Sequence, residues 1–311
     1  MVTEVVAPRS ASDAASGAGP TSGGAGSLRM RRVRDHLAFV PFLVYVTLFM
    51  LVPTAIVVIG AFQSDDGTPT LQNIVTVLGG ASFRDAFMRS IILSAQTAII
   101  GATLGGLLAW TLVDSDPNSW LRRVVLSASA VLAQFGGVML AFAFLATFGF
   151  NGLATMFMRD VVGLDVLGGT WIYGMNGLMV VYSYFQIPLM VIIFLPALGG
   201  LRREWWEASS SLGGSGWQFW RHVGGPVLAP SFLGALLLLF ANAFSAYATA
   251  AALVSQGSPI VPLRIRGALT SEVVLGQANV GKALALGMVV VVVIVMLLYA
   301  LLQRRASRWV K

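Results

Sequence analysis

Apolar residues along this chain occur in long blocks, not in the alternation of strands or the narrow stripes of surface helices. Six blocks are long enough to cross a bilayer, whose hydrocarbon layer of ~30 Å needs about 20 residues at a rise of ~1.5 Å each. None of the six contains Asp, Glu, Lys or Arg. The pattern predicts six transmembrane helices, at residues 37–62, 90–113, 124–149, 178–201, 231–254 and 283–303.

The composition supports a membrane protein. Of 311 residues, 57% are hydrophobic and 11% are charged, whereas a soluble domain has about 25% charged residues. A soluble protein of this length would lack the charge to cover its surface, so we expect an all-α integral membrane protein. The chain has no cysteine, which excludes disulfides and thiolate metal sites. We expect no metal and no cofactor.

The net charge of +7 is distributed unevenly along the chain. With the N-terminus in the cytoplasm, 14 of the 20 Lys and Arg residues fall on the cytoplasmic side, as the positive-inside rule requires. The charge therefore predicts a topology with both termini in the cytoplasm, and we expect no nucleic-acid partner. Residues 1–28, rich in Ala, Gly and Ser, are predicted to be a disordered cytoplasmic tail. Residues 29–311 form the predicted transmembrane domain.

The predicted spans offer neutral polar groups in place of charges. Ion-coupled transporters usually carry ionisable residues within the membrane, so any transport by this chain needs energy from a partner. Pro53 and Pro188 remove backbone hydrogen bonds inside spans and predict kinks. These kinks serve either ordinary packing or, in the fourth and fifth spans, a solute pathway. The candidate pathway residues are Tyr184, Gln186, Pro188, Asn242, Ser245 and Tyr247.

The segment Gly276–Lys282 has the glycine and lysine spacing of a phosphate-binding loop. That loop needs a preceding strand and a following Ser or Thr to hold magnesium, but Ala283 follows here. We expect no nucleotide site. The glycines are expected to let an external loop bend into the sixth span.

A long cytoplasmic loop, residues 202–230, separates the fourth and fifth spans. It predicts a short helix over 204–212, which carries Trp205 and Trp206 and ends at Gly213 in a left-handed conformation. A second helix is predicted from about Ser215, ending before Pro226. Two short amphipathic helices of this kind could simply lie on the membrane surface.

This loop resembles the EAA loop of ATP-binding-cassette (ABC) importer permeases. Glu207 and Ala208 match the start of that motif, Gly213 follows the Glu by six residues and Pro226 by nineteen, and Trp220 stands where the family has phenylalanine. The sequence departs from the family's pattern at Ser209, Gly214 and Gly225. Segments 184–189, 240–250 and 262–266 resemble the spermidine/putrescine-type branch.

The resemblance implies a type I importer permease (MetI-like) fold in a bacterial cell membrane, with a second homologous permease subunit completing the pore. A dimer of cytoplasmic ABC ATPases would hydrolyse ATP, so this chain itself would not be an enzyme. An extracytoplasmic solute-binding protein would deliver the solute, a polyamine first. The coupling loop that docks on the ATPase would contain Glu207, Ala208, Gly213, Trp220 and Pro226. The alternatives are a non-transporting membrane anchor or scaffold, and a secondary transporter, which the uncharged spans disfavour.

Overall fold

The computed structural model describes residues 39–113, 115–116, 118–163, 170–254, 260–270 and 277–306. Regular structure in these residues is helical, apart from an isolated bridge between Gln63 and Pro69. This confirms the predicted fold class, an all-α protein with six candidate membrane spans. The predicted tail, residues 1–28, lies outside the described residues. The helices long and apolar enough to cross a membrane are Phe39–Ala61, Ala81–Val113, Gly137–Asp160, Met175–Gly199, Gly216–Ser245 and Ala278–Arg304.

The described residues up to Ile56 belong to a first structural unit. A π-helical turn in it, η1 (Thr47–Leu51), leads into α2 (Val52–Ala61), which continues past the end of this unit. The N–H of Val52 bonds to the carbonyl of Thr47, five residues back. A wider turn of this kind gives room to the ring of Pro53, which would otherwise crowd a carbonyl in the preceding turn. The irregularity predicted at Pro53 is therefore a π turn.

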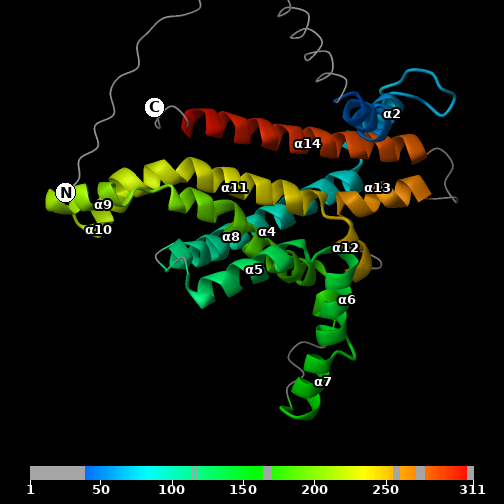
Figure 1. The fold of residues 1–311 in the computed structure, drawn as a ribbon. Helices are drawn as coiled ribbons and strands as arrows, with labels where there is room; N and C mark the ends of the chain where they lie inside the picture. The colour runs from blue at the N-terminus through cyan, green and yellow to red at the C-terminus, as the bar shows by residue number, and fades with distance from the viewer. Residues whose placement is uncertain are drawn as a thin grey trace, which may run out of the picture. The chain divides into compact units, whose positions relative to one another are not determined.

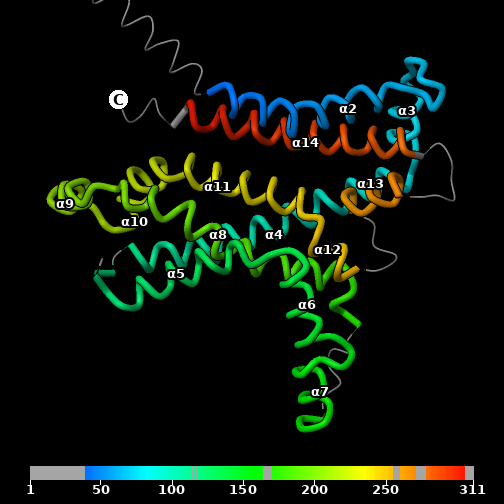
Figure 2. The backbone as a smooth tube through the Cα atoms, turned by 45° about the vertical axis from the view of Figure 1, so that its right-hand side comes forward, coloured from blue at the N-terminus to red at the C-terminus, as the bar shows by residue number. Residues whose placement is uncertain are grey.

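The second unit, from Val57 onward, holds the rest of the helices. The bounds of its elements are α3 (Gln72–Gly79), α4 (Ala81–Val113), α5 (Trp120–Gln134), α6 (Gly137–Phe148), α7 (Leu153–Asp160), η2 (Trp171–Tyr173), α8 (Met175–Gly199), α9 (Arg203–Ser211), α10 (Gly216–Phe219), η3 (Trp220–Gly224), α11 (Gly225–Ser245), α12 (Ala248–Leu253), α13 (Val261–Thr270) and α14 (Gln277–Ala306). Helices α4, α8 and α11 pack side by side, and α14 packs against α11 and α13 (Figures 1 and 2).

Glycines let α4 and α8 approach closely. A Cβ added to Gly101 would lie 2.6 Å from the Cβ of Gln186, and one added to Gly105 would lie 2.6 Å from the Cβ of Met190. Real Cβ atoms do not come this close, so the two helices touch along a path that larger residues would block. The contact of α4 with α8 is the centre of this unit.

Two predicted helices begin earlier than expected. Helix α4, which contains the second predicted span, begins at Ala81 and not at Ser90, so it includes nine residues before that span. The charged residues of this stretch keep it out of the hydrocarbon layer, but they are compatible with a helix in water. Likewise α14 begins at Gln277 and not at Ala283.

Two other predicted spans are interrupted. The third, expected over 124–149, breaks between α5 and α6, where Gly137 has a φ of +75°. The fifth, expected over 231–254, breaks at Ala246, which has an extended ψ of 109°. The first break follows from two adjacent glycines, which tolerate such backbone angles. The second has no glycine or proline at the break, where the Ala246 carbonyl accepts a hydrogen bond that is described below.

The segment with the spacing of a phosphate-binding loop is helical where the structure describes it. A Cβ on Gly281 would lie 3.1 Å from the Cβ of Ala268, so this glycine allows α13 and α14 to touch. The Nζ of Lys282 donates to Asn279 at 2.9 Å, and Asn279 donates to Asp65 at 3.0 Å. The prediction of a loop at these residues is therefore wrong. Gly281 serves the packing of two helices, and Lys282 is hydrogen-bonded within the chain.

Candidate functional site

The predicted coupling loop contains a sharp turn between two helices. Helix α9 ends at Ser211, and Gly213 follows with a φ of +77°, as the sequence predicted. The N–H groups of Gly213 and Gly214 bond back to the carbonyls of Ser210 and Ser209, at 3.0 and 2.9 Å. These bonds satisfy carbonyls that the end of a helix leaves unpaired. The turn therefore closes α9 and redirects the chain.

Helix α10 begins with a capping box. The backbone N–H of Gln218 donates to the Ser215 hydroxyl at 3.3 Å, and the N–H of Ser215 donates to the Gln218 side chain at 2.7 Å. Such a reciprocal pair satisfies two donors at a helix start. The start of this second helix agrees with the sequence prediction.

The predicted end of that helix, before Pro226, is wrong. The chain passes from α10 through the π-helical turn η3 into α11, and Pro226 lies in the first turn of α11. The N–H of Gly225 bonds to Trp220, five residues back, and this wider turn accommodates the proline ring. The second half of the predicted loop is thus part of one helical stretch, Gly216–Ser245.

Aromatic side chains fix the two helices of the loop to each other and to the membrane domain. The ring of Trp206 meets Phe219 edge to face at 4.9 Å, and Trp220 meets Trp110 of α4 at 5.7 Å. Such pairs each contribute about 0.5–1.5 kcal/mol beyond their buried area. Trp206 therefore packs within the loop, and Phe219, which the sequence analysis missed, is the buried residue beneath it.

The outer face of the loop is exposed. The side chain of Glu207 is 64% exposed and pairs with Arg203 at 3.3 Å, one turn earlier in α9. Leu212 is 89% exposed and Trp217 is 73% exposed. Exposed large apolar side chains with polar residues around them mark sites of contact with another protein or with a membrane. Figures 1 and 2 show α9 and α10 at the end of α11 that lies away from α12.

A second site lies where the two helix breaks meet. The hydroxyl of Thr249 in α12 accepts a bond from the N–H of Gly137 at 3.0 Å and lies 3.2 Å from that residue's carbonyl, to which it donates. The hydroxyl of Tyr182 in α8 donates to the carbonyl of Ala246 at 2.6 Å. At membrane depth, irregular backbone is tolerated where it is buried in protein or lines a water-filled cavity. The break at Ala246 is therefore a candidate for the solute pathway.

Four of the predicted pathway residues lie near these breaks and reach the surface. Tyr184 and Tyr247 are partly exposed, and Asn242 and Ser245 are exposed. The other two, Gln186 and Pro188, are buried between helices. The side-chain amide of Gln186 donates to the carbonyl of Leu239 at 2.8 Å. In this structure Gln186 joins α8 to α11, and neither Gln186 nor Pro188 lines an open surface.

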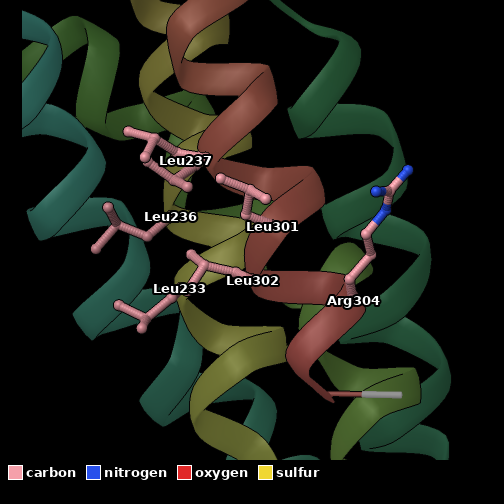
Figure 3. A pocket seen from close by; sticks show the side chains of 7 residues that line it. Leu233, Leu236, Leu237, Leu301, Leu302 and Arg304 are labelled. Carbon is pink, nitrogen blue, oxygen red and sulfur yellow. The ribbon is translucent and has the colours of Figure 1, made fainter. Parts of the chain in front are cut away.

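An apolar groove lies elsewhere. It has a volume of about 670 Å³ between α11 and α14 (Figure 3). Leucines from both helices line it, among them Leu233, Leu237 and Leu302, with Arg304 at one end. A polar solute would find few hydrogen-bonding partners in it, so we do not place the pathway here. Among the described residues, no group of His, Asp and Glu could hold a metal ion.

Comparisons with known proteins agree on one class of protein. No protein-family model matches the chain. The chain is 26% identical over 229 residues to a homolog of the spermidine/putrescine transport permease PotC of Mycoplasma pneumoniae, covering 66% of this chain and 71% of that protein. It is 26% identical over 185 residues to the thiamine transport permease ThiP of Haemophilus influenzae, covering 56% of this chain but 33% of ThiP.

The fold matches a solved structure described as a bacterial ABC transporter involved in the import of the acidic polysaccharide alginate. The TM-score is 0.69 at 16% identity, and the match covers 92% of this chain and 100% of that one. At this identity the match shows a shared fold.

Proposed function

We propose that this chain, an ABC importer permease subunit by its relatives and its fold, provides half of a solute pathway in a bacterial cell membrane. A second homologous permease subunit completes the pathway. A dimer of cytoplasmic ABC ATPases docks on the coupling loop, and an extracytoplasmic solute-binding protein delivers solute from the opposite side. The topology has both termini in the cytoplasm, with residues 1–28 as a tail.

The observation that carries this proposal is the structure of the coupling loop. Its exposed face presents Glu207 and Leu212, while its second helix continues without interruption into a membrane span. A helix pair that merely lay on the membrane surface would not need this continuity. A partner that pushes on α9 would move the whole of α11.

The pathway residues suit a conduit that must release its cargo. Tyr184, Asn242, Ser245 and Tyr247 supply hydroxyl and amide groups without formal charge. Such groups make hydrogen bonds of about 0.5–1.5 kcal/mol net, which hold a passing solute weakly. Tight selection then resides in the solute-binding protein, and the energy comes from ATP hydrolysis in the partner.

A polyamine is the first solute to test. The support is the resemblance of segments 184–189 and 240–250 to the spermidine/putrescine-type branch, together with one relative of that name. Thiamine and alginate oligosaccharide, which other relatives and structural neighbours are named for, are the comparison solutes.

The experiment that tests the coupling role compares Glu207→Ala with Glu204→Ala. Both residues lie in α9 and are exposed. Loss of a charge-assisted hydrogen bond costs about 1.5–3 kcal/mol, which weakens docking roughly 10- to 100-fold. The exposed pair of Glu207 with Arg203 contributes about 0.3–0.5 kcal/mol, so folding should be unaffected.

The measurements are uptake and co-purification of the ATPase, at equal permease abundance. We expect Glu207→Ala to lose both and Glu204→Ala to retain them. Normal uptake and normal ATPase recovery in the Glu207→Ala variant would exclude this residue from the contact. Equal losses in both variants would assign the effect to α9 as a whole.

A further inference from the structure

The coupling loop and the break in the fifth span are joined by a single helical stretch. From Gly216 to Ser245 the chain has 30 helical residues, a length of about 45 Å. The π turn η3 lies at the loop end of this stretch, where Trp220 packs on Trp110, and Pro230 lies in the first half of α11, so most of the helix toward Ser245 is regular. Because a helix resists bending, a displacement of the loop is carried along α11 to its far end at Ser245.

The far end of α11 is linked to a helix that is anchored separately. Two residues, Ala246 and Tyr247, connect α11 to α12. Helix α12 is tied to the start of α6 by the reciprocal bonds of Thr249 with Gly137. Motion of α11 relative to α12 must therefore be absorbed by the backbone of this two-residue link.

One side chain holds the link in place. Tyr182 is fully buried in α8, and its hydroxyl donates to the carbonyl of Ala246. The other described side-chain hydrogen bond between α8 and α11, from Gln186 to Leu239, lies two turns back within α11. The Tyr182 bond is thus the one that acts on the link itself. The Ala246 carbonyl is partly buried, and Tyr182 is the donor that the described structure gives it, which favours a discrete, held geometry.

We propose that Tyr182 is a positioning residue for transport, because its bond to Ala246 makes the link after α11 the hinge through which the coupling loop moves the solute pathway. This inference rests on the proposed function. The neighbouring residues Asn242, Ser245 and Tyr247 are exposed or partly exposed. Movement at the hinge therefore changes which polar groups face the pathway.

The test uses the absence of cysteine from this chain. Ala248→Cys, at a partly exposed residue directly after the link and outside the proposed pathway residues, places one thiol beside the link for labelling in every variant. The unmodified chain is the reference for uptake and ATP hydrolysis. The rate at which a water-soluble maleimide labels the thiol is measured in the assembled complex, in membranes, with and without ATP and vanadate. Uptake and ATP hydrolysis are measured on the same membranes, and permease abundance is matched.

Tyr182→Phe removes the hydroxyl and keeps the ring. We expect ATP hydrolysis to continue, uptake per ATP to fall about tenfold, as loss of one buried hydrogen bond predicts, and the ATP-dependent change in labelling to disappear. Thr249→Val removes the hydrogen bonds that tie α12 to Gly137 of α6, and it should have the same effect. Tyr173→Phe is the matched control, since the Tyr173 ring stacks on Phe150 away from α11.

Normal uptake per ATP and a normal labelling change in both Tyr182→Phe and Thr249→Val would overturn the hinge. So would a loss of permease abundance in both variants, because the bonds would then serve folding. If only Tyr182→Phe lowers permease abundance, uptake per ATP and the labelling change in Thr249→Val decide whether the link is the hinge. If the unmodified chain shows no uptake and the labelled thiol in its otherwise unchanged sequence shows no response to ATP, the importer role fails, independently of Tyr182.

Discussion

A substitution series at Gly213 isolates the backbone turn of the coupling loop from its surface chemistry. The residue has a φ of +77°, and an added Cβ would meet no atom within 4 Å. A side chain at this position therefore clashes with no neighbour, and its cost comes from the backbone. For an ordinary residue the left-handed conformation costs roughly 1–2 kcal/mol. Asparagine tolerates it better, and a β-branched residue tolerates it worse.

The predicted order of function is Gly213→Asn, then Gly213→Ala, then Gly213→Val. Since 1.4 kcal/mol corresponds to a factor of ten, the alanine variant should hold the ATPase about tenfold more weakly and the valine variant more weakly still. The assay is ATPase recovered per permease, together with uptake at matched abundance. Gly199→Ala is the control, because Gly199 also has open space around its Cβ but no positive φ.

The reasoning is refuted if the three variants lose function equally, because the loss would then come from any side chain at the partner surface. It is also refuted if Gly213→Val docks and transports normally, because the turn would then not need its left-handed residue. A loss that followed side-chain volume, with asparagine worse than alanine, would likewise point to the surface and not to the backbone.

Three further outcomes follow from the structure. Gly105→Ala should lower the melting temperature of the purified chain, because overpacking against Met190 costs about 1–3 kcal/mol; Gly106→Ala, whose nearest neighbour atom lies at 3.3 Å, should lower it less, and the opposite order would contradict the close packing of α4 on α8. Lys282→Ala should leave ATP hydrolysis by the complex intact, and loss of nucleotide binding would restore the phosphate-loop interpretation. A reporter fused after Gly214 should read as cytoplasmic and one near Gly67 as external; an external signal at Gly214 would remove the docking site from the ATPase.

Local features of the sequence predicted the membrane class and the turn of the coupling loop. Charge-free blocks reveal spans because a charged residue in hydrocarbon is costly whatever its neighbours are. The left-handed turn at Gly213 was predictable for a similar reason, since glycine between two helical stretches is the residue that adopts it without strain. In both cases the physical cause lies within a few residues of the feature.

The helix breaks depend on partners that are distant in the sequence. Nothing local marks Ala246, where the chain leaves the helix, because the bond that stabilises this break comes from Tyr182 in another span. The continuation through Pro226 was missed for a related reason. Proline usually ends a helix, but the π turn before it removes the clash that would do so. The same arrangement precedes Pro53.

Polar residues inside spans have two uses that composition does not separate. Gln186 was grouped with the pathway, yet its amide bonds the backbone of α11 and its side chain is buried. Asn242, with the same functional group, is exposed on α11. An amide exposed to lipid without a partner costs about 2–7 kcal/mol, so a helix face that carries Asn242 beside Ser245 is poorly suited to hydrocarbon. In the proposed pore, a second permease subunit or the water of the shared pathway would supply partners for the Asn242 amide, and this requirement favours a pore-forming subunit over a solitary membrane anchor.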